Sequence, residues 1–107
     1  MQLSTTDFLP GYHIVEVLDI ARGSTVRARH IGRDIGAAFK SVVGGEIGSY
    51  TELMATAREQ AIERLIADAE SLQADAIINV RFMTAMVMQG ASEILAYGTA
   101  VRIEKTQ

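Results

Sequence analysis

Three stretches of the chain have the apolar pattern of β-strands. Residues 12–22 are rich in β-branched and aliphatic residues and lie between turn signals, with Gly23 behind them. Residues 24–29 either extend this strand or form a bent continuation, because Gly23 permits a bulge. Residues 76–88 predict a second strand, and residues 93–103 its hairpin partner after a tight connection at 89–91. Gly98, inside the last strand, indicates a bulge or the close approach of another backbone.

A short helix is predicted between the first two strands. Ile31, Ile35 and Phe39 recur every four residues and form one apolar stripe. Two glycines inside the stripe weaken it, each by about 1 kcal/mol relative to alanine. We expect this helix to end at the glycine pair 44–45.

A second, longer helix is predicted from Tyr50 to about Gln73. This stretch contains neither Gly nor Pro, and its apolar residues follow helical spacing. Ser49 and Glu52 in front of it match a capping box, in which two side chains satisfy backbone donors at a helix start. The predicted order is therefore β-α-α-β-β, within a single domain that covers residues 1–107. We expect an α+β fold, with a three-stranded, mainly antiparallel sheet and two helices.

The predicted sheet is apolar on both faces. An antiparallel sheet with one wet face alternates apolar and polar residues, and these strands hardly do so. Either the two helices cover opposite faces, or both lie on one face and neighbouring subunits cover the other. The short first helix is a poor cover for three strands, so we favour a closed homo-oligomer, the usual way to bury such a surface.

Composition narrows the possible partners and locations. The net charge is -3, so the strong positive field that nucleic acids require is missing. No apolar run approaches the roughly 20 residues that span a bilayer, and residues 1–10 lack the features of a signal peptide. The chain has no Cys, which removes disulfides and thiolate sites. We expect a cytoplasmic protein with no nucleic-acid or membrane partner.

Two residue types suggest metal ligands, and neither forms a convincing set. Met83, Met86 and Met88 could supply soft ligands, but strand alternation places Met83 on the opposite face from the other two. The two histidines, His13 and His30, have no second His or Cys at ligand spacing. We therefore expect no metal site and no cofactor.

Charged and glycine-rich residues around the first helix are the other candidates. Arg27, Arg29, Arg33 and Asp34 could bind a small anion, bridge subunits or form a solvated turn. Residues 44–49 form a glycine-rich loop before a helix start, where backbone donors can hold an anion. Glu46 within this loop would repel phosphate, so a conformational role for the glycines is the better interpretation. No Ser-His-Asp or paired-carboxylate pattern can be assembled, so we do not expect an enzyme.

Four segments resemble one family of small bacterial proteins. They are IGRD at 31–34, VGGEIGSYTEL at 43–53, REQAIERL at 58–65 and AYGTAV at 96–101. They are similar to the YbjQ-like family, which carries a heavy-metal-binding label, and the similarity covers almost the whole chain. The chain differs at residues 72–76, where the family favours a Gly-Ala-Asn-Ala type of turn and this sequence has Gln73.

The resemblance implies a dodecin-like subunit in a homopentameric ring and no established activity. Its metal label finds no support in a chain without Cys and with two separated His. The leading hypothesis is a homo-oligomer that binds a small ligand between subunits; heavy-metal binding or storage and an enzyme with an intersubunit site are the alternatives. The family's shared segments select five candidate ligand or interface residues: Arg33, Asp34, Glu46, Tyr50 and Tyr97.

Overall fold

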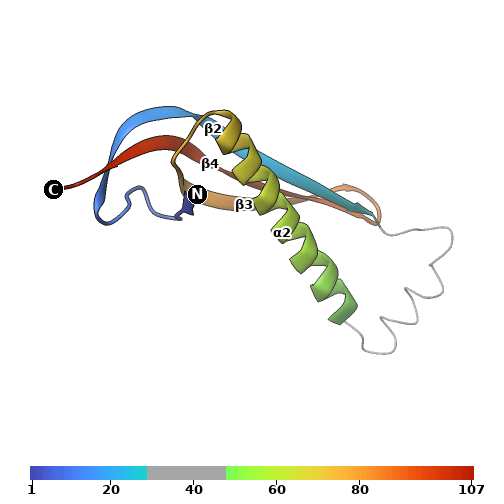
Figure 1. Cartoon of the computed structure of the whole chain (residues 1–107). Helices are drawn as coiled ribbons and strands as arrows, with labels where there is room; N and C mark the ends of the chain where they lie inside the picture. Colours follow the sequence, from blue (N-terminus) through green and yellow to red (C-terminus); the bar gives the residue numbers. More distant parts are fainter. Residues whose placement is uncertain (29–47) are drawn as a thin grey trace.

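The computed structural model describes residues 1–28 and 48–107, with side chains for 1–27 and 53–107. This part of the chain holds four strands and one helix (Figure 1). The strands are β1 (Gln2–Leu3), β2 (Tyr12–Ala28), β3 (Ala76–Met88) and β4 (Ala91–Lys105), and the helix is α2 (Gly48–Ser71). Helix α2 begins and ends within two residues of the predicted bounds.

The four strands form one mixed sheet in the order β1-β3-β4-β2. β4 pairs antiparallel with β2 on one side and with β3 on the other, while β1 pairs parallel with the start of β3. The strands are long for a small domain, where five or six residues are usual. β2 has 17 residues and extends about 56 Å, whereas the 24 residues of α2 extend about 36 Å. The helix is too short to cover the whole length of the sheet.

The α2 helix packs closely on one face of the sheet, against β2 and β4 (Figure 1). Gly23 of β2 lies directly beneath the helix, where an added Cβ atom would be 2.3 Å from the backbone nitrogen of Leu65. The helix presents small side chains to the sheet, which allows this close approach. The core on this face is fully buried and includes Ala57, Ala61, Leu65, Ala69, Ile77, Ile94 and Ala96.

A bulge in β3 reverses the alternation of its side chains. Asn79 has a left-handed φ of 54°, and the pairing with β4 shifts by one residue between Ile78 and Arg81. Ile77 and Val80 therefore both belong to the core under α2, while Ile78 packs on the other face. Strict alternation along β3 would place Ile78 and Val80 on the same face. The bulge puts them on opposite faces, and a bulge residue cannot be identified from apolar spacing.

Gly98 of β4 lies opposite this bulge. A Cβ atom there would be 2.7 Å from Cγ2 of Ile77 and 2.9 Å from the carbonyl oxygen of Ile78. The predicted close approach of another backbone is thus confirmed.

The N-terminal segment covers part of the other face and part of one edge. Leu9 packs against a small second cluster of Ala76, Ile78 and Val101. Ser4 and Thr6 provide carbonyl oxygens that accept hydrogen bonds from the backbone N–H groups of Val80 and Asn79, both at 2.9 Å. The N-terminal segment therefore protects the outer edge of β3 as far as Val80.

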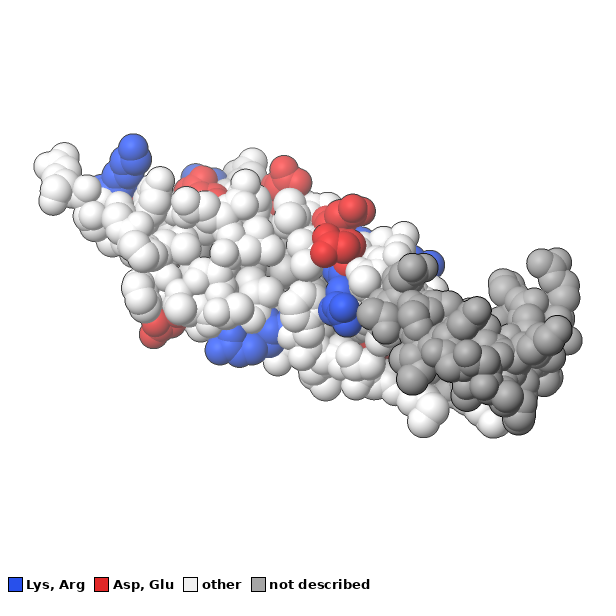
Figure 2. Space-filling view, turned by 90° about the horizontal axis from the view of Figure 1, so that it is seen from below, with Lys and Arg blue, Asp and Glu red and all other residues white. Residues whose placement is uncertain are grey.

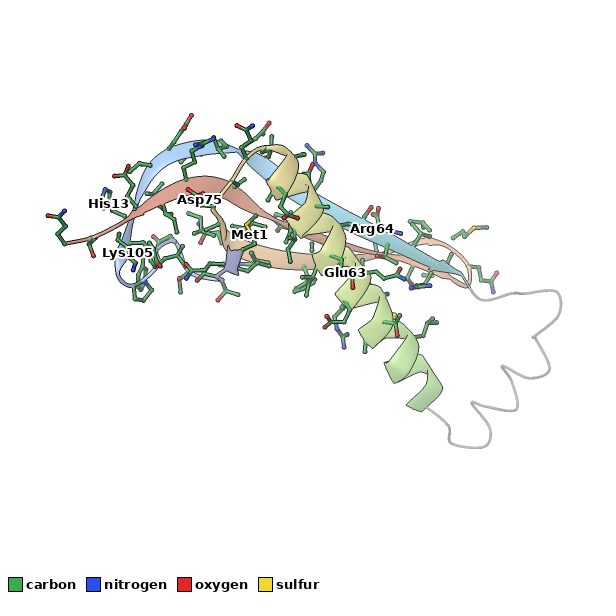
Figure 3. All side chains as sticks on the ribbon, viewed as in Figure 1. Met1, His13, Glu63, Arg64, Asp75 and Lys105 are labelled. Atoms are coloured by element: carbon green, nitrogen blue, oxygen red, sulfur yellow. The ribbon has the colours of Figure 1, made fainter. Side chains whose placement is uncertain are left out.

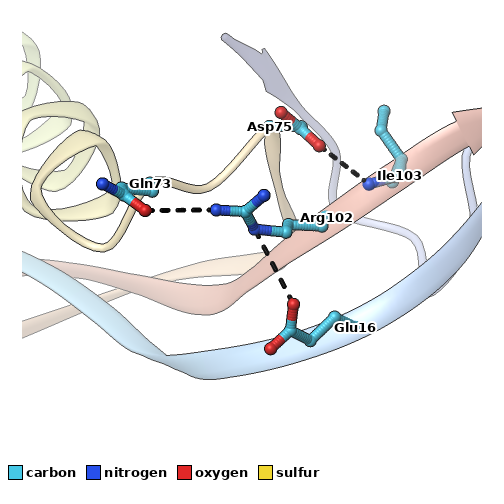
Figure 4. Close-up of polar contacts among 5 residues, drawn as sticks. All are labelled: Glu16, Gln73, Asp75, Arg102 and Ile103. Atoms are coloured by element: carbon cyan, nitrogen blue, oxygen red, sulfur yellow. Dashed lines mark hydrogen bonds and ion pairs between the residues drawn. The ribbon is translucent and has the colours of Figure 1, made fainter.

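The end of α2 is closed by a non-glycine residue in the left-handed region. Gln73 has a φ of 61°, and the N–H of Ala74 donates to the carbonyl of Ala69 at 3.0 Å. The Gln73 side chain accepts a hydrogen bond from Arg102, whose Nε lies 3.7 Å from Oε1 of Glu16 (Figure 4). Gln73 therefore takes a backbone conformation that favours glycine.

The predicted fold class is wrong in its element count. The described residues form four strands and one helix in the order β-β-α-β-β, where the sequence predicted three strands and two helices. The additional strand is β1, whose two residues are too few to show a pattern. The predicted first helix at 31–42 lies outside the described residues, and the ring assembly is not shown by one chain. The extension of the first strand through residues 24–28 is confirmed.

Candidate functional site

The last part of β3 is an unpaired, apolar edge. We call residues 82–88 the distal β3 segment. β1 and the N-terminal segment stop short of it, and in the described part of the chain no strand pairs with its outer side. Every residue of the segment is exposed, and none is charged. Its large apolar side chains are 45–76% exposed: Phe82, Met83, Met86, Val87 and Met88.

The opposite edge of the sheet, on β2, is protected by α2. Asp68 accepts a hydrogen bond from the N–H of Arg22 at 2.9 Å, and Arg64 donates to the carbonyl of Ser24 at 2.5 Å. Figure 3 shows Arg64 on the side of α2 that faces β2. Asp19 accepts from the N–H of Ile20 at 2.7 Å. Side chains thus occupy the backbone groups of β2 that would otherwise pair with another strand.

The face of the sheet away from α2 is also partly apolar. Val17, Ile20 and Val26 of β2 are each more than half exposed. Figure 2, which views the molecule from below and not this face alone, shows broad uncharged surface between small groups of charged side chains. The apolar pattern predicted for both faces is therefore present, and α2 covers only one of them.

A pocket lies beside the distal β3 segment, on the face that α2 covers. Arg27, Ser92 and Met86 are opposite one another across β2, β4 and β3. Leu53 and Met54, near the start of α2, line the space above this row. The pocket has a volume of ≈ 240 Å³, and we call it the hairpin pocket; its lining residues are Arg27, Leu53, Met54, Met86, Gly90, Ala91 and Ser92.

Two buried polar atoms on this face lack hydrogen-bond partners within the described ranges. They are Nε of Arg27 and Oγ1 of Thr25, which is 2% exposed. Thr25 pairs with Ile94, one row closer to the middle of the sheet than Arg27 and Ser92. Leaving such groups without partners costs about 1–3 kcal/mol each. The polar side of the hairpin pocket therefore has unused hydrogen-bonding capacity.

The structure does not bring the five predicted site residues together. Arg33, Asp34 and Glu46 lie outside the described residues. Tyr50 belongs to α2, but its side chain is also outside the described set. Tyr97 is half-buried on the face away from α2, between Arg22 and Arg81 in register. The sheet therefore separates the Tyr97 side chain from the helix that carries Tyr50.

The sequence analysis singled out two residues of the hairpin pocket, Arg27 and Met86, and missed Ser92. Arg27 was considered as part of an arginine cluster, and Met86 as a soft ligand. Ser92 has no motif that distinguishes it, and it becomes a candidate only when the register places it opposite Arg27. The opposite faces predicted for Met83 and Met86 are confirmed, since they pair with Leu95 and Ser92 in one uninterrupted register.

The described side chains do not fit a metal centre. No group of three His, Cys, Asp or Glu residues lies close enough there to hold an ion. His13 lies near Lys105, at the opposite end of the sheet from the hairpin pocket, and its Nε2 is 3.7 Å from Oε2 of Glu104 (Figure 3). Met54 and Met86 both line the hairpin pocket, but they share it with the cationic Arg27. A positive guanidinium in the same pocket disfavours a metal cation.

In the described residues, fold and site define a two-layer arrangement, in which one helix covers one face of a four-stranded mixed sheet and no described strand pairs with the apolar distal β3 segment. Among its described helices, none is long and apolar enough to cross a membrane. The chain belongs to the YbjQ-like family, whose model, described as "Putative heavy-metal-binding", matches residues 1–104.

Relatives named "UPF0145 protein" cover nearly the whole chain. The one from Thermosipho africanus is 55% identical over 99% of this chain and 98% of its own length. The one from Methanosarcina acetivorans is 55% identical over 96% of this chain and 97% of its own length.

A solved structure shares the fold. It is a crystal structure of a protein of unknown function from Pediococcus pentosaceus, assigned in its title to the DUF74 family. The similarity covers 97% of this chain and 98% of that one, with a TM-score of 0.67 and 21% identity.

Proposed function

We propose that the protein acts as a homo-oligomer whose subunits associate through the distal β3 segment, and that a small ligand binds in the hairpin pocket beside this interface. The observation that carries the proposal is the uncharged, unpaired edge of residues 82–88. Soluble proteins usually block such edges with charges, proline or a covering element. Side chains bond three backbone groups of the β2 edge, whereas no described element covers the distal β3 segment.

A second copy of the chain is the occupant that best fits this edge. Another strand would satisfy the outward backbone groups and would also cover the apolar side chains on both faces of the segment. The segment has no charged residue that would repel an identical copy or select a different, charged partner. Homo-oligomers with closed symmetry are the common solution for such surfaces.

The number of subunits comes from the family resemblance. Five copies of the 11.6 kDa chain give a mass of about 58 kDa. Two further statements stay predictions: the protein lacks enzymatic activity, and it works in the cytoplasm.

Lysine substitutions in the distal β3 segment test the interface. Met83 and Val87 are 55% and 52% exposed in the subunit, so lysine at either position leaves the subunit core intact. We expect Met83→Lys and Val87→Lys to reduce the mass measured by light scattering toward 11.6 kDa. Phe8→Lys is the matched control, since Phe8 is 58% exposed on the N-terminal segment, and it should keep the native mass.

Two results would refute the interface. One is a native protein that has the monomer mass at every concentration. The other is an oligomer whose mass is the same in both lysine variants as in the native chain. Circular dichroism of each variant should match the native spectrum, so that loss of mass is not confused with unfolding.

Heavy-metal binding is the second candidate function. The shared position of Met54 and Met86 in the hairpin pocket is the observation in its favour, because thioethers bind soft ions such as copper(I). Calorimetric titration with copper(I) and zinc(II) tests it. Copper(I) binding at micromolar concentration that is lost in Met54→Leu would support metal binding over the binding of a small ligand in the hairpin pocket.

A further inference from the structure

We infer that the hairpin pocket binds a small organic carboxylate, with the Arg27 guanidinium holding the anionic group. This inference rests on the proposed function for its site and adds the chemical class of the ligand. It also opposes the metal label of the family, because the charge in the pocket selects anions.

Among the described lining residues of the pocket, the charged one is Arg27. Within the described ranges Arg27 forms no ion pair with a carboxylate, and its Nε is buried without a hydrogen-bond partner. Arginine binds carboxylates through two parallel N–H···O bonds, which are short and strong because both groups are charged. An external carboxylate in the pocket would give the half-buried Arg27 guanidinium the anionic partner that it lacks within the described ranges.

The hydroxyl groups next to Arg27 add polar capacity on the same side. Ser92 lines the pocket directly opposite Arg27. Thr25 follows two residues away on the same face, with a buried and unpartnered Oγ1. The Ser92 hydroxyl can donate one hydrogen bond to an acceptor oxygen of a ligand, whereas Thr25 lies beside this side of the pocket and does not line it.

The remaining lining makes the ligand organic rather than inorganic. Leu53, Met54 and Met86 provide three large apolar side chains around the same space. Methionine adapts readily to the shape of an apolar ligand. A free phosphate or sulfate ion would leave this apolar surface unused, whereas the short hydrocarbon chain of a carboxylic acid would fill it.

The size of the pocket limits the ligand to a small molecule. Its volume of ≈ 240 Å³ is below the roughly 300–1,000 Å³ typical of pockets for drug-sized ligands. Met86, at 76% exposure, belongs both to the pocket and to the distal β3 segment. In the proposed oligomer, association would bury Met86 further and narrow the pocket entrance.

Calorimetric titration of the full chain with hexanoate tests the inference. We expect saturable binding of hexanoate, and at least about tenfold weaker binding of 1-hexanol, which lacks the charge. Inorganic phosphate should also bind at least about tenfold more weakly than hexanoate, since it lacks the apolar part. Copper(I) and zinc(II) should not compete with hexanoate.

Two arginine variants show whether hexanoate binds through Arg27 in the pocket or through positive surface charge in general. Arg27→Gln removes the charge and leaves a shorter side chain that can still donate hydrogen bonds, and it should weaken hexanoate binding at least about tenfold. Arg22→Gln is the matched control on the same strand, because Arg22 is exposed on the opposite face and its side chain does not line the pocket. It should bind hexanoate like the native chain.

Several results would overturn the inference. The first is the absence of saturable binding of hexanoate up to about 10 mM, a concentration at which even weak binding would be seen. The second is equal hexanoate affinity of the native and Arg27→Gln proteins. The third is equal affinity of the native protein for hexanol and hexanoate. Loss of the oligomer in Arg27→Gln, with no hexanoate binding by the native protein, would assign Arg27 to an ion pair between subunits and likewise overturn it.

The molecular mass of each sample, measured by light scattering, tests the proposed assembly independently of hexanoate binding. All lining residues of the pocket come from one chain, so hexanoate binding can be measured whether or not the chain associates. A monomeric protein that binds hexanoate refutes the assembly alone. An oligomer that does not bind it refutes the carboxylate site alone.

Discussion

Asp68 on α2 accepts a hydrogen bond from the backbone N–H of Arg22 on β2, with 2.9 Å between Oδ2 and the nitrogen. One turn earlier on the same helix, Arg64 donates to the carbonyl of Ser24. The two side chains therefore block the free edge of β2 with opposite charges at i and i+4. The distal β3 segment has no such protection among the described residues, and this difference between the two edges is the basis of the proposed assembly.

Removing the Asp68 carboxylate should weaken the helix-to-edge connection. We expect Asp68→Ala to lower the free energy of unfolding by about 1 kcal/mol, the usual net contribution of one hydrogen bond. Urea denaturation at one fixed protein concentration would measure it. Glu70→Ala is the control on the same helix, because Glu70 is exposed and its carboxylate makes no hydrogen bond in the described part. Equal effects of the two substitutions would contradict a specific role for Asp68.

A methyl group at Gly23 should force the helix away from the sheet. The added Cβ would meet the backbone of Ala61, Arg64 and Leu65 at 2.3–2.7 Å, and a helix backbone cannot move aside as a flexible side chain can. We expect Gly23→Ala to destabilise the protein by about 2–3 kcal/mol, the upper range for overpacking. Thermal denaturation followed by circular dichroism would show a lower Tm.

Gly11 provides the control for this substitution. An added Cβ there meets nothing within 4 Å, but its φ of 82° is unfavourable for alanine. Gly11→Ala should therefore cost only the roughly 1–2 kcal/mol of a left-handed backbone. A Gly23→Ala protein as stable as the native one would show that α2 does not pack as described.

Glycine at position 73 should stabilise the end of α2. Gln73 holds a φ of 61°, which costs roughly 1–2 kcal/mol for a residue with a Cβ. Gln73→Gly removes this strain. Two effects offset part of the gain: glycine has greater freedom in the unfolded chain, and the exposed hydrogen bond with Arg102 is lost. We expect a net stabilisation of about 0.5–1 kcal/mol by urea denaturation. Gln73→Ala, which removes the amide and keeps the strain, should give no stabilisation.

The long elements could be predicted from the sequence because their patterns span many residues. Helix α2 and the β3–β4 hairpin follow from an unbroken apolar stripe and a tight connection at 89–91. Gly23 leaves two predictions open, an extension of the first strand or a bent continuation, and the strand extends to Ala28. The sequence does not show whether a glycine ends a strand or makes room for a helix packed on the strand. Only the position of α2 distinguishes the two roles.

The features that depend on long-range register could not be predicted. β1 consists of Gln2 and Leu3, and it is a strand only because Ala76 and Ile77 lie beside it. The bulge at Asn79 needs a left-handed backbone that apolar spacing does not show. The hairpin pocket exists because three strands and a helix meet, so Arg27 and Ser92 could not be paired from their positions in the chain.

The central claim is that a second copy of the chain pairs with the distal β3 segment, and hydrogen exchange resolved by NMR at single amides tests it most directly. In an isolated subunit, the amides of residues 82–88 that point away from β4 exchange fast, while those bonded to β4 are protected. Our account predicts that both sets are protected in the native protein, and that the outward set loses its protection in Met83→Lys. Fast exchange of the outward amides in the native protein, at concentrations where it is oligomeric, would contradict the account.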